Sequence, residues 1–333
     1  MRHGNISLQQ AVDIVEQLGG SHVVSAILQD KKFPPVKYGQ VELGQLEALM
    51  NKCGGWEAVQ AVLRGEKEVL LQDAAPPLFD HNGRRIPPPG FKASVVDADP
   101  NLDFTHGGDT WNYERRLSRL RDAFNLSTVG IGPVEFKDRT QTILEGLRAY
   151  GRVSNITEGA WFPIVIPEMQ IADYGEALES QLLPAVERSY LDWFPERKFV
   201  NYPVGVLKGQ VKIVHSSHER LLALLNQDEG SLPAVYFPNS LQGFSIPADR
   251  EQMDTLPNNV LLCGGVDTCV AMAMYPDILA RDAQTPGLDM AALEWQAYRH
   301  SLSFRARDNQ LDFDLRHTTL AFKNYSGGLL VLG

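Results

Sequence analysis

The sequence predicts an α+β protein in which N-terminal tandem helical hairpins are followed by a mixed α/β body with an antiparallel C-terminal sheet. Three observations predict this class: a self-similar segment with helical periodicity, a proline-rich stretch behind it, and strand and helix patterns that alternate irregularly afterwards. Because the body lacks a regular βαβ rhythm, an α+β arrangement fits better than a doubly wound sheet. The 333 residues therefore divide into repeats over 1–72, a linker over 73–90 and a body over 91–333, with 155–160 as the candidate place for a further division.

The N-terminal segment repeats itself. Residues 6–33 align without a gap with residues 41–68, at an offset of 35. Each copy carries an apolar helical stripe, a glycine pair and a second apolar stripe, a pattern typical of a helical hairpin. Both copies carry more acidic than basic side chains, so DNA binding is disfavoured and docking or packing is favoured. Trp56 and Arg64 of the second copy are candidate partner-binding residues.

The linker is polar and punctuated by prolines, with a candidate hairpin turn at Asn82-Gly83. Behind it, periodicity predicts the elements of the body. The expected helices cover 113–124, 140–151, 175–193 (with a kink or break at Pro184), 217–226 and 267–279. The expected strands cover 92–96, 161–166, 210–214, 234–237, 260–263, 301–307, 311–316, 319–323 and 329–332.

The last of these strands include a hairpin whose register can be predicted. With Asn309-Gln310 as a two-residue turn, Arg307 faces Asp312 and Arg305 faces Asp314. We interpret these charges as a solvated ion ladder on a half-buried sheet. The alternative is a carboxylate pair for acid–base chemistry, which is disfavoured because a neighbouring arginine keeps an aspartate ionised.

Composition limits the function classes. The net charge of −10 argues against a nucleic-acid surface. Three cysteines are too few, and odd in number, for a disulfide framework. No run of about 18 apolar residues is present, and the N-terminus shows no apolar secretory leader. We therefore expect a cytoplasmic protein with no membrane association.

Cys269 is the candidate nucleophile. It follows an apolar strand and the glycine turn Gly264-Gly265, in what reads as the first turn of a helix, where a thiol pKa can be lowered. His300 or His317, on later strands, would be the base, which is the chain order of papain-like hydrolases. The competing interpretation is that Cys269 fills apolar space. The same glycine turn is a candidate phosphate cradle, although neither common phosphate-binding motif is complete.

Two further clusters are candidates for binding. His215 and His218 lie three residues apart at a strand-to-helix junction, but a zinc site needs further ligands that the spacing does not supply, so we expect no metal and no cofactor. Arg115, Arg116, Arg119 and Arg121 lie on the helix after Asn112. We interpret them as a solvated face, and they form the basic patch in which we expect any binding by the body.

Several segments carry a resemblance: 232–247 with 250–253, 265–269, 274–277, 285–290 and 325–330 in the body, and 51–55 with 63–66 near the N-terminus. They resemble a group of bacterial proteins of unknown function that is typical of candidate phyla with reduced genomes. The resemblance covers both ends of the chain and, more weakly, the middle. It implies a cytoplasmic bacterial origin and a modular build, and it implies no activity.

Two hypotheses follow. The first is a non-catalytic interaction or adaptor protein that docks a protein partner, or a second copy of the chain, through the N-terminal hairpins. The second is a hydrolase that uses Cys269 with His300 or His317. The first is favoured because no set of side chains with catalytic spacing is complete.

Overall fold

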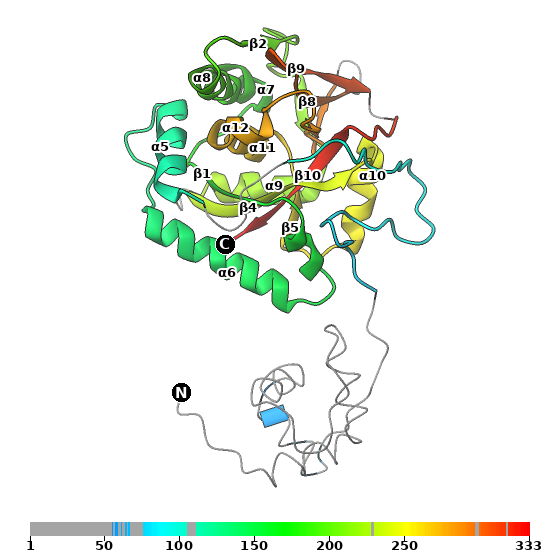
Figure 1. Ribbon diagram of the computed structural model, residues 1–333. Coiled ribbons are helices and arrows are strands. Elements are labelled where there is room, and N and C mark those ends of the chain that lie inside the picture. Colours follow the sequence, from blue (N-terminus) through cyan, green and yellow to red (C-terminus); the bar gives the residue numbers. More distant parts are fainter. Residues whose placement is uncertain are drawn as a thin grey trace. The chain divides into compact units, whose positions relative to one another are not determined.

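The computed structural model describes residues 76–104, 111–227, 230–296, 300–317 and 319–333, together with residues 55, 57, 58, 61, 64 and 66. The chain divides into two compact units, Met1–Ala74 and Ala75–Gly333. The second unit combines helices with one large sheet (Figure 1), which confirms the α+β class for this part of the chain. The first repeat, 6–33, and most of the second, 41–68, lie outside the described residues, so the tandem hairpins stay a prediction.

The second unit begins inside the segment predicted as a linker. Phe79 is completely buried and forms an antiparallel bridge with Arg85. Arg85 is itself buried, and its guanidinium donates to Gln252 Oε1 (3.2 Å) and Thr255 Oγ1 (2.7 Å). The linker prediction is therefore wrong from about residue 78. The prolines led to the prediction of an irregular linker, but one buried aromatic residue and one buried arginine attach this segment to the body.

The turn predicted inside this segment is present. Gly83 has a φ of +72°, a backbone conformation that favours glycine. Asp80 N–H donates to Arg84 O (2.8 Å), and Asp80 Oδ1 accepts from the N–H groups of Asn82 (2.8 Å) and Arg84 (2.9 Å). The Asp80 side chain thus stabilises the turn that reverses the chain between Phe79 and Arg85.

Ten described strands form one sheet. They are β1 (Phe162–Ile166), β2 (Lys198–Asn201), β3 (Val211–Ile213), β4 (Leu232–Gln242), β5 (Val260–Leu262), β6 (Gly287–Asp289), β7 (Leu293–Trp295), β8 (His300–Ala306), β9 (Gln310–His317) and β10 (Tyr325–Leu332). The main path runs β1-β4-β10-β6-β8-β7-β3, with β5 on β10, β9 on β8 and β2 on β9. The pairs β10–β6 and β2–β9 are parallel and the others antiparallel. The sheet is thus mixed rather than purely antiparallel.

Strand β4, which lies between β1 and β10, is buried on both faces. Ala234 and Tyr236 face one hydrophobic core, whereas Val235, Phe237 and Leu241 face another. Helices α5 (Tyr113–Phe124), α8 (Leu183–Trp193) and α11 (Gly265–Met274) contact one another over the first core, and α6 (Pro133–Ala149) and α10 (Ile246–Glu251) lie on the second (Figure 1). Burial on both faces explains why this strand is almost continuously apolar in the sequence.

The remaining helices are α7 (Tyr174–Ala177), α9 (Ser216–Leu225) and α12 (Pro276–Leu279), with short turns η1 (Ser154–Glu158), η2 (Leu178–Leu182) and η3 (Gln252–Thr255). Helix α5 has the bounds that the sequence predicts. Asn112 Oδ1 accepts from Arg115 N–H (2.9 Å) at its start, and Asn125, with φ +54°, ends it. Within the described part of the chain, no helix has the length and apolar composition needed to cross a membrane.

Pro184 lies at the second position of α8, directly after the wide turn η2, which has π-type hydrogen bonding and continues from α7. A proline has no N–H to donate to the preceding turn, and a π turn is one way in which a helix accommodates such a gap. The kink or break predicted at Pro184 therefore takes the form of a π turn between α7 and α8.

The C-terminal hairpin has a different register from the predicted one. Arg305 faces Asp312, Ser303 faces Asp314, and Arg307 N–H donates to Gln310 O (2.8 Å), so the turn lies at Asp308 and Asn309. The shift is by two residues, which keeps every side chain on its predicted face. The predicted pairing of Arg307 with Asp312 is present as an ion pair. The ladder is solvated only in part, because Arg307 and Asp314 are exposed whereas the Asp312 side chain is only 2% exposed.

Two predicted strands are absent from the described structure. Residues 319–323 form no strand, and residues 92–96 contribute only the isolated bridge between Val95 and Phe244. Strand β10, which follows residues 319–323, already pairs with β4 along one edge and with β5 and β6 along the other, so these residues cannot form a hairpin with it.

Candidate functional site

Cys269 is completely buried in α11 among apolar side chains. Burial, and then the charge of Asp267, raise the pKa of its thiol well above the usual value. His300 and His317 face each other across β8 and β9, with ring centroids 5.4 Å apart, and His317 is exposed. A nucleophilic cysteine needs a stabilised thiolate, and this environment destabilises one. The geometry therefore supports the interpretation of Cys269 as apolar filling.

The glycine turn and the histidine pair, predicted separately, meet in one buried network. The His218 ring lies directly on Gly264, where a Cβ atom would come within 2.5 Å of it. Tyr174 Oη accepts from Val266 N–H (2.8 Å) and is hydrogen-bonded to His218 Nε2 (2.7 Å). Asp267 Oδ1 accepts from Gly264 N–H (2.9 Å). The start of α11 is thus filled by the protein's own side chains, which leaves no room for the predicted phosphate.

The two histidines have structural roles. His215 Nδ1 accepts from Ser217 N–H (3.2 Å) at the start of α9 and lies 2.7 Å from Ser217 Oγ. His218 is fully buried. Burial lowers the pKa of both rings. No group of three or more His, Cys, Asp or Glu side chains in the described residues is placed to hold a metal ion.

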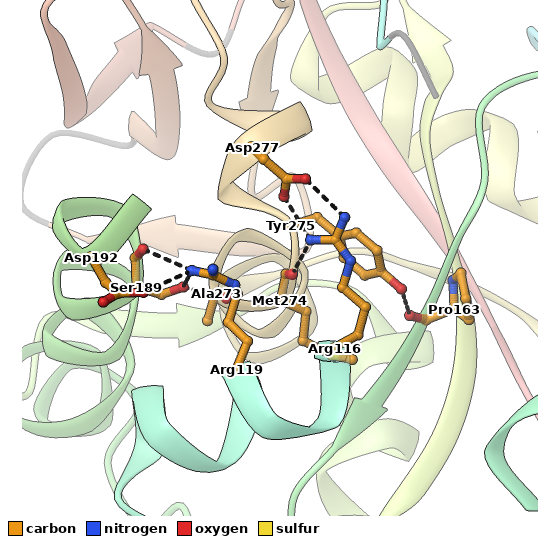
Figure 2. A network of polar contacts seen from close by, with 9 residues as sticks. All are labelled: Arg116, Arg119, Pro163, Ser189, Asp192, Ala273, Met274, Tyr275 and Asp277. Atoms are coloured by element: carbon orange, nitrogen blue, oxygen red, sulfur yellow. Dashed lines mark hydrogen bonds and ion pairs between the residues drawn. The ribbon is translucent and has the colours of Figure 1, made fainter. Parts of the chain in front are cut away.

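Arg116 does not belong to a solvated face, so the prediction is wrong for this residue (Figure 2). Its guanidinium forms a bidentate ion pair with the Asp277 carboxylate of α12, with N–O distances of 2.6 and 2.8 Å. It also donates to Met274 O (2.8 Å). It lies over the Tyr275 ring, 4.3 Å from the centroid. Arg116 therefore connects α5 to α12. Because the residue is only 8% exposed, it is not available to a partner.

Of the other predicted arginines, Arg115 and Arg119 line a hollow between α5 and α8, and Arg121 does not. This hollow, of about 250 Å³, is lined by charged and polar side chains that include Arg115, Ser118, Arg119, Asp122, Arg188 and Asp192. The Arg115 and Arg119 guanidinium groups each lie 4.6 Å from the centroid of the Trp193 ring. Arg188, from α8, donates to Ala123 O near the end of α5. We call this site the arginine hollow.

The cations of the arginine hollow are incompletely neutralised. Arg119 reaches Ser189 Oγ at 3.3 Å and Asp192 Oδ2 at 3.4 Å, both long contacts (Figure 2). Among the described residues, Arg115 and Arg188 have no carboxylate at ion-pair distance. Arginine presents a fork of donors that matches a carboxylate or phosphate group. The arrangement can therefore bind an anionic group.

The two aspartates of the rim do not cancel this capacity. Asp122 pairs with Arg121 at 3.2 Å, outside the hollow, and its side chain is 66% exposed. The Asp192 side chain is 75% exposed. Both carboxylates are therefore well hydrated and screened. The Arg119 side chain, by contrast, is only 11% exposed, and burial lowers its pKa.

The sequence predicted part of the arginine hollow. Arg115 and Arg119 were identified from their spacing on one helix, whereas Arg188 and Trp193 come from α8 and carry no local signal that links them to α5. Of the N-terminal candidates, Trp56 lies outside the described residues. Arg64 is exposed and pairs locally with Glu66, at 2.7 Å.

No family model, curated protein or solved structure matches this chain. The chemistry of the arginine hollow is therefore inferred from its side chains.

Proposed function

We propose that this protein is a non-catalytic docking protein that binds an acidic segment of a protein partner in the arginine hollow. One observation carries the proposal: three arginines from two helices surround one hollow, and two of them have no carboxylate partner among the described residues. Charge-assisted bonds from arginine to carboxylate are among the stronger polar interactions at protein interfaces.

A carboxylate-bearing peptide fits this site better than a nucleic acid does. The chain carries a net charge of −10, which disfavours binding to the phosphate backbone of a nucleic acid. The hollow, of about 250 Å³, holds a few side chains and no extended groove. We therefore infer a local contact with one or two acidic side chains, flanked by the Trp193 ring.

The alternative function, a hydrolase that uses Cys269 with His300 or His317, requires a thiolate that burial and Asp267 both oppose. This observation favours docking over catalysis.

The predicted tandem hairpins would supply a second docking surface that includes Trp56, for a protein partner or a second copy of the chain. In that case the chain would act as an adaptor with two separate surfaces. We place it in the cytoplasm, where thiols such as Cys263 and Cys269, both free and buried, stay reduced.

The test is a titration of the full-length protein against a fluorescently labelled hexaglutamate peptide, followed by anisotropy at low salt. The double variant Arg115→Gln/Arg188→Gln should bind about a hundredfold more weakly, since each of the two removed charge-assisted bonds contributes of the order of 1.5 kcal/mol. Arg121→Gln is the matched control, because Arg121 lies on the same helix but does not line the hollow. Its affinity should stay within about twofold of that of the wild type.

Equal affinity in the double variant and the wild type would contradict the proposal, as would an equal loss in Arg121→Gln. A single-stranded oligonucleotide of matching charge should bind more weakly than the peptide. Tighter binding of the oligonucleotide would show that the hollow prefers a nucleic acid to an acidic protein segment.

A further inference from the structure

A second hollow, of about 290 Å³, lies beside the end of β4 and shares no lining residue with the arginine hollow. Its walls come from the Asp80–Arg84 turn, from the end of η1 and from β4, which contributes Asn239 and Gln242. Leu102 and Phe104 supply an apolar wall. We call it the β4 hollow.

The floor of the β4 hollow is held by close backbone contacts. A Cβ atom on Gly83 would lie 2.6 Å from Gly159 N, and one on Gly159 would lie 2.6 Å from Asn82 O. Asn239 Nδ2 donates to the same Asn82 O (3.0 Å). Because two glycines allow the Asn82 turn to touch the end of η1, the polar side chains around the hollow are attached to a preorganised base.

Three charged side chains line the β4 hollow: Arg84, Asp103 and Glu158. Asp103 pairs with Arg281 at 3.3 Å, which leaves Arg84 and Glu158 as two opposite charges without an ion-pair partner in the described part of the chain. Arg84 donates through one terminal nitrogen to Gln242 Oε1 (3.1 Å). Neither Arg84 nor Glu158, which also lines the hollow, forms an ion pair with any described residue, and they do not pair with each other. A cation and an anion at one small cavity are complementary to a ligand that carries both charges.

We propose that the β4 hollow binds a free α-amino acid, with the ligand carboxylate on Arg84 and the ligand ammonium group on Glu158. The volume lies at the low end of the range for small-molecule pockets, which suits a ligand of this size. Leu102 and Phe104 would contact the ligand side chain, so apolar amino acids should bind best. Asn239 and Gln242 add amide groups to the polar wall. This site does not depend on the arginine hollow.

The experiment is saturation-transfer NMR and calorimetry on the full-length protein with the standard L-amino acids as probes. At least one apolar amino acid should bind saturably in the millimolar range or tighter. Its N-acetyl derivative and its methyl ester, each of which lacks one charge, should bind at least tenfold more weakly. Acetate and methylamine should not compete.

Glu158→Gln and Arg84→Gln should each weaken binding of the same amino acid at least tenfold. Glu158 is exposed, so its variant should fold normally even if Arg84→Gln does not. The matched controls are Glu145→Gln and Arg148→Gln, at exposed positions of α6 that do not line the hollow, and both should bind like the wild type.

The proposal is overturned if no amino acid binds saturably, if the capped derivatives bind equally well, or if Glu158→Gln leaves the affinity unchanged. Hexaglutamate binding should be the same in Glu158→Gln and the wild type, which separates this site from the proposed docking function.

Discussion

At the scale of single residues, Asp249 of α10 has an unusual environment. Its carboxylate is completely buried, and neither oxygen has a hydrogen-bond partner among the described residues. It lies against Gly327, where a Cβ atom would come within 2.6 Å of Asp249 Oδ2. Burial, and then the charge of Asp289, raise the pKa of Asp249 well above its usual value, against a smaller opposing effect of Arg316. The folded protein therefore keeps a proton on Asp249 at a pH where the unfolded chain has lost it.

This difference predicts a pH-dependent stability. Above the unfolded pKa of about 3.9, the folded state binds the extra proton, so the free energy of unfolding falls as the pH rises towards the folded pKa. Asp249→Asn keeps the shape and removes the ionisation. We expect this variant to be more stable than the wild type by about 1–3 kcal/mol at pH 7, with a gain that shrinks towards pH 4. Urea unfolding at several pH values measures both effects.

Asp289→Asn is the contrasting variant. Burial raises the pKa of Asp289 to about 6, but this carboxylate pairs with Arg316, whose side chain is only 4% exposed. Removing it leaves a buried cation without its partner, so Asp289→Asn should destabilise the protein at pH 7. A gain in stability from Asp289→Asn, or a loss from Asp249→Asn, would show that the two carboxylates have the opposite roles.

Substitution by alanine should have opposite effects on stability at two glycines, Gly264 and Gly146. Gly264→Ala would bring a Cβ atom within 2.5 Å of the His218 ring, which Tyr174 holds by a hydrogen bond of 2.7 Å. We expect this overpacking to cost about 1–3 kcal/mol. Gly146 lies within α6, with nothing inside 4 Å of its Cβ position, so Gly146→Ala should stabilise by about 0.5–1 kcal/mol through helix propensity. Thermal unfolding of both variants tests the pair, and a neutral Gly264→Ala would show that the His218 ring can move aside.

At the scale of elements, two ion pairs connect α5 to its neighbours with different strengths. Arg116 and Asp277 join α5 to α12, with side chains 10% and 17% exposed. Arg119 and Asp192 join α5 to α8 at 3.4 Å, and the Asp192 side chain is 75% exposed. Breaking a buried pair leaves an uncompensated charge, whereas an exposed pair contributes little.

Asp277→Ala should therefore destabilise the protein by about 3–5 kcal/mol, and Asp192→Ala by less than about 1 kcal/mol. Chemical unfolding followed by tryptophan fluorescence gives both values. Similar losses from the two variants would mean that the connection between α5 and α12 is carried by apolar packing instead of by Arg116.

The sequence predicted elements better than it predicted their connections. Helix α5 has its predicted bounds because Asn112 and Asn125 are strong local signals for its two ends. The hairpin register failed by two residues, because a shift of two preserves the apolar face and no local pattern distinguishes the two registers. Residues 319–323 have strand-like composition but form no strand, and the strand that follows them, β10, already has partners on both sides.

The candidate site shows the same limit. Spacing on one helix identified Arg115 and Arg119, but it could not show that Arg116 turns inward to Asp277 or that Arg188 and Trp193 complete the hollow. Cys269 matched the order of residues in a family of hydrolases, yet its burial depends on packing that no motif records. Local patterns thus predict which side chains share a face, whereas burial and partners depend on the tertiary structure.

At the scale of the whole molecule, the boundary of the second unit depends on residues 76–90. Phe79 is completely buried and Arg85 is 4% exposed, and Arg85 reaches Gln252 and Thr255 in η3. The second unit begins at Ala75. The proline-rich segment therefore closes one side of the second hydrophobic core instead of separating it from the N-terminal repeats.

A chain that begins at residue 76 should consequently keep the cooperative thermal unfolding of the second unit, whereas one that begins at residue 91 should unfold at a lower temperature or fail to fold. In the full-length chain, Phe79→Ala should cost about 3–5 kcal/mol, the usual loss for a fully buried phenylalanine. Ile86→Ala, at a side chain that is 40% exposed, should stay within about 0.5 kcal/mol of the wild type. Near-ultraviolet circular dichroism during heating follows the packing of this unit in all four proteins. Unchanged unfolding in the chain that begins at residue 91 would restore the interpretation of residues 73–90 as a linker, since it would show that Phe79 and Arg85 contribute nothing to the stability of the body.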